Sequence, residues 1–307
     1  MKKQWIYYGI GVTASVIYLL LTFLAPATSN AFGLSSLQIL LLKITVALPY
    51  IATWIFGVYG LSTLDKYIEL TKDKNDNMTN TLIFLRSGLL WIIMGTILVG
   101  VIGSARSYFA TNTEIRPLFT IVTNYLYIFP QLIGFFFIFR GVIKLQASKE
   151  MSEHKHTSYF FTTLIVVLIS CIYVYMVATN PSRQFSPDPN MAATYYLPDI
   201  LIGFTIVLPI LTTWWLGFSA AFTLSDLIPY LTRAELFKGV TRIVYGIWAT
   251  IFTSILIQAL LSLGGTRLSG LSLGIILLIV YVFVLLQGIG FLFIALGSNT
   301  LRKSVKA

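Results

Sequence analysis

The chain has 307 residues, of which 57% are hydrophobic and only 10% are charged, and its formal net charge is +10. An ordinary soluble domain carries about 25% charged residues, so this composition leaves too little polar surface for a soluble enzyme of this length. The single cysteine, Cys171, excludes an intrachain disulfide. With only two histidines, His154 and His156, we expect no bound metal and no cofactor. The composition predicts an all-α integral membrane protein whose main partner is the lipid bilayer.

Eight apolar runs follow one another along the chain, each close to or above the roughly 20 residues that cross a bilayer as a helix. Backbone groups in lipid have to bond within their own segment, which favours helices. The first run is followed by Ala25-Pro26-Ala27 and resembles a signal peptide, but it exceeds the roughly 7–15 apolar residues of such a peptide, so we expect it to stay as a span. The eight predicted spans are Trp5–Leu24, Leu37–Leu61, Leu82–Gly103, Leu118–Phe139, Tyr159–Ala178, Ile200–Leu224, Ile243–Leu263 and Leu271–Leu296.

The lysines and arginines predict the orientation, because cytoplasmic loops of membrane proteins carry an excess of them. One side of the predicted topology collects sixteen cations: Lys2, Lys3, Lys66, Lys72, Lys74, Arg86, Arg140, Lys144, Lys149, Lys155, Arg233, Lys238, Arg242, Arg302, Lys303 and Lys306. The other side has four, which are Arg106, Arg116, Arg183 and Arg267. Both termini are therefore expected in the cytoplasm, with the protein multi-pass in the cell membrane. The positive charge is explained by topology, so we expect no nucleic-acid partner.

The two halves of the chain resemble each other. At an offset of 160, residues 43–64 and 203–224 share eight of 22 positions, including the uncommon Pro49/Pro209 and Trp54/Trp214. A second block aligns residues 131–138 with 287–294 at an offset of 156 and pairs Gln131 with Gln287. This pattern predicts two four-helix repeats, 1–150 and 151–307. Four helices are an even number, so the repeats would run in the same sense, related by a pseudo-twofold axis along the membrane normal.

Several residues inside the predicted spans are candidates for a solute pathway. Pro49 and Pro209 each free a backbone carbonyl in mid-span, and each serves either as a hinge or as a static kink. Gln131 and Gln287 are a matched pair of buried amides, and Asn124 lies on the same helical face as Gln131. Such amides either line a polar cavity or bond helices together.

Lys43 is a charge inside a predicted span, and an intramembrane charge is a functional hypothesis by default. By the repeat, Asp199 lies about one turn further out on the equivalent span. The two residues are candidates for an ion pair at the external mouth. In the alternative interpretation, Lys43 extends to the interface and Asp199 begins its helix.

Two functions fit these patterns. The first is a transporter or channel-like facilitator for a small solute, with its site between the two repeats. The second is a non-catalytic structural or interaction subunit of a membrane assembly, which leaves a second copy or another membrane protein open as a partner. An enzyme needs a nucleophile, a metal or an acid–base pair, and no such constellation is apparent in the sequence, so we expect no catalytic residues.

Overall fold

A computed structural model describes residues 2–24, 36–71, 77–105, 115–147, 162–172, 192–228, 234–263 and 273–306. Within these ranges every element is helical. The helices are α1 (Lys2–Leu24), α2 (Ser36–Thr71), α3 (Asn77–Ala105), α4 (Ile115–Ala147), α6 (Ala192–Leu227), α7 (Ala234–Leu263) and α8 (Leu273–Lys306), and a short helix, Thr162–Ile172, lies between α4 and α6 in the chain.

Six helices have described stretches that are long and apolar enough to cross a membrane. These stretches are Trp5–Leu24, Ala47–Thr71, Thr79–Ile102, Tyr125–Lys144, Ala234–Ile257 and Val282–Lys303. The chain is thus a polytopic helical membrane protein, and the predicted all-α membrane class is confirmed.

The helices extend further than the apolar runs that predicted them. The predicted ends at Leu61 and Leu296 are too early, because α2 continues to Thr71 and α8 to Lys306. With 36 residues, α2 is about 54 Å long, whereas the hydrocarbon core of a bilayer is about 30 Å thick. Helical hydrogen bonding continues past the apolar stretch, so hydropathy locates the membrane-spanning part of a helix and not its ends.

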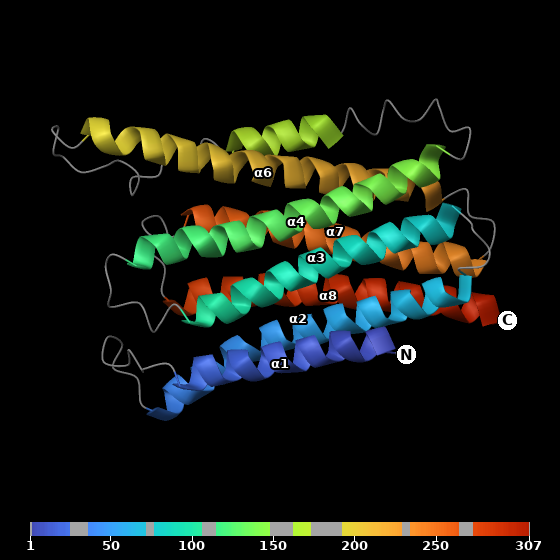
Figure 1. The fold of residues 1–307 in the computed structure, drawn as a ribbon, viewed down its shortest axis with the longest axis horizontal. Helices are drawn as coiled ribbons and strands as arrows, with labels where there is room; N and C mark the ends of the chain where they lie inside the picture. Colours follow the sequence, from blue (N-terminus) through green and yellow to red (C-terminus); the bar gives the residue numbers. More distant parts are fainter. Residues whose placement is uncertain are drawn as a thin grey trace.

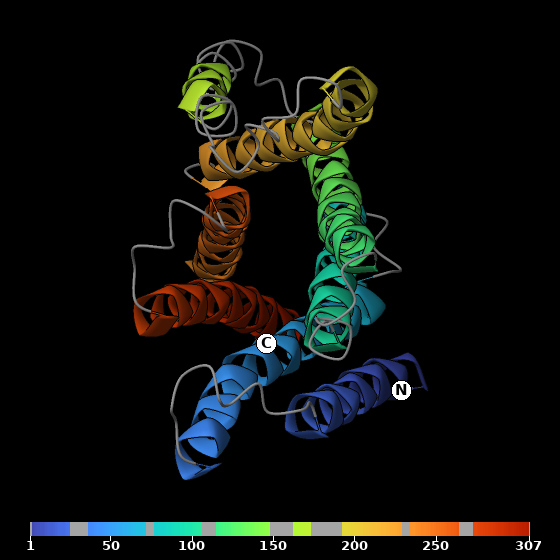
Figure 2. The same ribbon diagram turned by 90° about the vertical axis from the view of Figure 1, so that its left-hand side faces the viewer.

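Six of the helices form a closed ring (Figure 2). Around the ring, α2 contacts α3, α3 contacts α4, α4 contacts α6, α6 contacts α7, α7 contacts α8, and α8 returns to α2. Helix α1 lies outside this ring against α2 and α3. The short helix Thr162–Ile172 also lies outside, on the α6 side of the ring.

Glycines let two pairs of ring helices approach until their backbones nearly touch. On the α3–α4 seam, a Cβ at Gly134 would lie 2.7 Å from the carbonyl oxygen of Gly88. On the α7–α8 seam, a Cβ at Gly246 would lie 2.5 Å from the carbonyl oxygen of Gly290. Small residues of this kind are what close packing of membrane helices requires.

The second helix of each half of the chain packs on the last helix of the other half. The Thr53 hydroxyl of α2 donates a 2.8 Å hydrogen bond to the Val284 carbonyl of α8. Correspondingly, Trp215 of α6 meets Phe139 of α4, with ring centroids 5.4 Å apart in an edge-on arrangement. The ring is therefore closed because α2 packs against a helix of the second half of the chain and α6 packs against a helix of the first half.

The first and last helices place the two chain ends at the same end of the molecule (Figure 1). The C-terminal ends of α2 and α4 and the N-terminal ends of α3 and α7 lie at that end as well. The described cations Lys66, Arg86, Arg140, Lys144, Lys238, Arg242, Arg302 and Lys303 belong to these helix ends. These eight cations lie at one end of the molecule, whereas Lys43 contacts the last turn of α1 at the other end.

Candidate functional site

Gln131 lies at the middle of α4 and faces the centre of the ring. On this helix Gly134 faces α3, whereas Phe135 faces α6, where its ring lies 3.4 Å from the position of a Cβ at Gly217. A helix turns by about 100° per residue, so Gln131 lies about 60° from Gly134 and about 40° from Phe135, between the two contact faces. The exposed Phe136 lies on the opposite, outer face of α4.

Gln287 has the same placement on α8. Gly290 faces α7, and the Ala295 methyl group faces α2, 3.9 Å from a Cβ at Gly60. Gln287 lies about 60° from Gly290 and about 80° from Ala295, again between the two contact faces. The side chain is only 3% exposed, so it points to the centre of the ring and not outward.

Two hydroxyl groups face the same centre. Tyr127 lies one turn before Gln131 on α4, and Ser254 lies on α7 between Thr250, which contacts α8, and Ile251, which contacts α6. Helices α4 and α7 stand on opposite sides of the ring (Figure 2). The Tyr127 and Ser254 hydroxyls nevertheless lie close enough to interact. They meet across the centre.

These four side chains, Tyr127, Gln131, Ser254 and Gln287, form what we call the central polar cluster. All four are between 0% and 3% exposed. Within the described residues, both amide atoms of Gln131 and Nε2 of Gln287 have no hydrogen-bond partner. A buried polar group without a hydrogen-bond partner destabilises the fold by about 1–3 kcal/mol. Water or a polar ligand bound at the cluster would remove this destabilisation.

Two buried phenylalanines follow the glutamines along α4 and α8. Phe135 and Phe291 lie one turn after Gln131 and Gln287, respectively, towards the C-terminal ends of α4 and α8. Both phenylalanines are 1% exposed and belong to the hydrophobic core. Polar groups at mid-height are thus followed by apolar packing towards the end of the ring where the chain termini lie.

No protein family, curated protein or solved structure matches this chain. Within the described residues, no group of three or more His, Cys, Asp or Glu side chains could hold a metal ion. The chemistry of the central polar cluster is that of neutral hydrogen bonding.

The two prolines lie inside helices α2 and α6, which continue through them. Pro49 is buried and Pro209 is half-buried. One turn later, Thr53 bonds across to α8, whereas the Thr213 hydroxyl donates to the Pro209 carbonyl of its own helix at 2.6 Å. The choice between hinge and static kink stays a prediction. The side chain of the fifth pathway candidate, Asn124, lies outside the described residues.

Lys43 is held at the C-terminal end of α1. Its ammonium group donates a 3.2 Å hydrogen bond to the carbonyl oxygen of Phe23, in the last turn of α1. A cation is favoured there by the helix dipole. The side chain of Asp199 lies outside the described residues, so the predicted Lys43–Asp199 pair stays a prediction.

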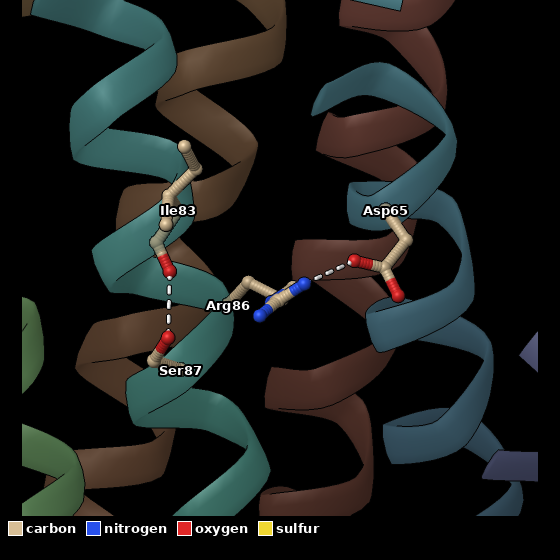
Figure 3. Close-up of polar contacts among 4 residues, drawn as sticks. All are labelled: Asp65, Ile83, Arg86 and Ser87. Carbon is tan, nitrogen blue, oxygen red and sulfur yellow. Dashed lines mark hydrogen bonds and ion pairs between the residues drawn. The ribbon is translucent and has the colours of Figure 1, made fainter. Parts of the chain in front are cut away.

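Sequence reasoning missed an ion pair between α2 and α3. Arg86 donates to Asp65 Oδ1 at 2.8 Å (Figure 3), and the Asp65 side chain is only 7% exposed. Tyr7 of α1 also lies beside Asp65. The pair was missed because Asp65 falls beyond the predicted span end at Leu61, although the helix continues. It joins the ring helices α2 and α3 to each other and to α1, and it is not part of the central polar cluster.

Ser254 was also missed as a site residue. Its i, i+4 spacing with Thr250 indicates a packing seam, and Thr250 does lie in one, against Gly290. Ser254 lies about 40° further round the helix, which is enough to turn it from the α8 contact to the centre. A packing residue and a centre-facing residue on α7 can be distinguished only when the positions of the neighbouring helices α6 and α8 are known.

Proposed function

We propose that this protein is a facilitator for a small solute, which passes through the centre of the six-helix ring. The observation that carries the proposal is the central polar cluster, in which the Gln131 amide and Nε2 of Gln287 are buried without a hydrogen-bond partner among the described residues. In hydrocarbon or in a dry core these groups are costly. Water or a polar solute at the centre would supply their missing hydrogen bonds.

We further propose that the ring consists of two parallel four-helix repeats, 1–150 and 151–307. Matching contacts support this: Gly88 and Gly246 each meet a glycine carbonyl of the following helix. Trp54 and Trp214 are both fully buried, and Gln131 and Gln287 both face the centre. A pseudo-twofold axis through the ring would then pass through the central polar cluster, where parallel-repeat transporters place their sites.

Eight spans and a cytoplasmic location of both termini complete the proposal. The short helix Thr162–Ile172 falls within the predicted span Tyr159–Ala178 and would be part of the fifth crossing. The cation-rich helix ends share one end of the molecule with the termini (Figure 1), and the positive-inside rule assigns that end to the cytoplasm of a cell membrane.

Phe135 and Phe291 bear on how a solute would pass. Both side chains are buried in the hydrophobic core one turn beyond the glutamines, which favours a route that opens when helices shift, over a continuously open water channel. The cluster pairs no nucleophile with a base, as an enzyme would require. We therefore propose transport and not catalysis.

Thiol accessibility tests the proposal. Gln131→Cys and Gln287→Cys, each in a Cys171→Ser background, are treated with methyl methanethiosulfonate, a small uncharged reagent that needs a thiolate and hence water at the site. We expect both cysteines to react faster than a control cysteine at Phe136, which faces outward on the same helix. If neither reacts faster than the control, the centre is dry.

A dry centre would favour the alternative function, a non-catalytic subunit in which the glutamines join helices. In that case both amides would find partners through small side-chain rotations. Gln131→Leu would then lower stability only, without any effect on the passage of solutes.

A further inference from the structure

Resting on the proposed function, we infer that the central site accepts a small uncharged solute with an amide- or urea-type group. Three features of the site support this inference: the absence of charge around the centre, the hydrogen-bonding edge that a carboxamide presents, and the packing that limits the size of the solute.

Charge is absent from the middle of every ring helix. The uncharged stretches are residues 44–64 of α2, 87–105 of α3, 117–139 of α4, 200–225 of α6, 243–263 of α7 and 273–301 of α8. An ion that enters the central polar cluster would lose its hydration without meeting a countercharge. Buried charges are stable only when they are paired, so the site discriminates against ions of either sign.

The amides define the hydrogen-bonding pattern. A carboxamide carries an N–H donor and a carbonyl acceptor side by side in one plane. Gln131 has both amide atoms unpartnered, and Gln287 has its Nε2 unpartnered. The group that pairs best with such an edge offers an acceptor and a donor on adjacent atoms, as urea and simple amides do.

The hydroxyls complete the match. The Tyr127 and Ser254 hydroxyls lie close enough to interact with each other, and each keeps further donor or acceptor capacity with which to bond the edge of the solute that the glutamines leave free. A simple alcohol or polyol bonds through single hydroxyl groups and does not reproduce the paired edge. The buried Phe135 and Phe291 on the next turn place apolar side chains beyond the glutamines, which favours a solute of few atoms.

Two alkylating reagents of nearly equal size test the charge argument. Ser254→Cys in the Cys171→Ser background is treated with iodoacetamide, which is uncharged, or with iodoacetate, which is an anion. We expect iodoacetamide to react at least about tenfold faster relative to iodoacetate than it does at a control cysteine in place of the exposed Lys303. Equal ratios at the two positions would overturn the inference.

Competition tests the amide edge. Urea or acetamide at non-denaturing concentration should slow the alkylation of Ser254→Cys, whereas equimolar glycerol or rubidium chloride should not. Equal protection by glycerol would overturn the amide assignment, although it would leave a solute site in place. An unreactive cysteine at position 254 would contradict the proposed function itself, so the two failures are distinguishable.

Flux measurements with the full chain in liposomes give an independent readout. Radiolabelled urea should equilibrate faster than glycerol, and rubidium should not equilibrate above the rate of empty liposomes. Gln131→Glu keeps the shape of the side chain but introduces charge, and we expect at least a tenfold loss of urea flux. Gln287→Glu repeats the test if the first variant does not fold, and Phe136→Leu on the outer face is the control. Rubidium flux, or unchanged urea flux in folded glutamate variants, would overturn the inference.

Discussion

Replacing Gly246 by alanine should weaken the α7–α8 seam. The added Cβ would lie 2.5 Å from the Gly290 carbonyl oxygen, 2.5 Å from Ile294 Cγ1 and 3.0 Å from the Ile294 backbone nitrogen. Two of these three atoms are backbone atoms, which have no rotamer to move into, so the helices have to separate. Overpacking of this kind costs about 1–3 kcal/mol.

The matched control is Gly9→Ala in α1, where a Cβ would meet nothing within 4 Å. Alanine is the better helix former by about 1 kcal/mol, and both variants gain this contribution. We therefore expect Gly246→Ala to unfold with a free energy about 1–3 kcal/mol lower than that of Gly9→Ala.

Reversible unfolding in mixed micelles with increasing dodecyl sulfate, followed by tryptophan fluorescence, measures this difference. Equal stability of the two variants would refute the close backbone approach at Gly246. Gly290→Ala on the facing helix checks the result, because its Cβ would lie 2.9 Å from the Gly246 carbonyl oxygen.

Three other substitutions probe single contacts. Asp65→Asn should lower the unfolding free energy by about 2 kcal/mol, because it removes a charged hydrogen bond and leaves Arg86 unpaired, and the exchange Asp65→Arg with Arg86→Asp should restore part of the loss in the same unfolding assay. Thr53→Val should cost about 0.5–1.5 kcal/mol through its lost interhelical bond, more than Thr213→Val, whose hydroxyl bonds its own helix; equal losses would contradict this. Lys43→Ala should increase amide hydrogen exchange in the last turn of α1, and unchanged exchange would show that its hydrogen bond there is unimportant.

The spans were predictable because membrane crossing imposes a single strong requirement, a long apolar segment with internally bonded backbone. Trp5–Leu24 is identical as a predicted and an observed apolar stretch. The ends were less predictable, since Asp65 and Arg302 are polar and yet still helical. Hydropathy reports the solvent around a helix, whereas the helix itself ends where its hydrogen bonding ends.

The sequence predicted which glutamines belong to the candidate site, but not how the site residues are oriented. The matched glutamines stood out because they interrupt apolar sequence at equivalent places. Their orientation, and the inward position of Ser254, depend on which neighbour lies on each side of the helix. The contact of α2 with α8 joins residues as far apart as Thr53 and Val284, and a pairing at that separation leaves no local signature in the sequence.

The packing of α2 against α8, the last helix, has a consequence for biosynthesis. Chains fold progressively from the N-terminus as they are made. The face of α2 that carries Thr53 and Gly60 therefore has no partner until α8, the last helix, leaves the ribosome. A nascent chain that stops before α8 has an unfinished ring, with this face open to lipid or to quality-control factors. Premature termination near the C-terminus would therefore damage the first half of the protein as much as the second, and two separately expressed halves would each depend on the other for completion.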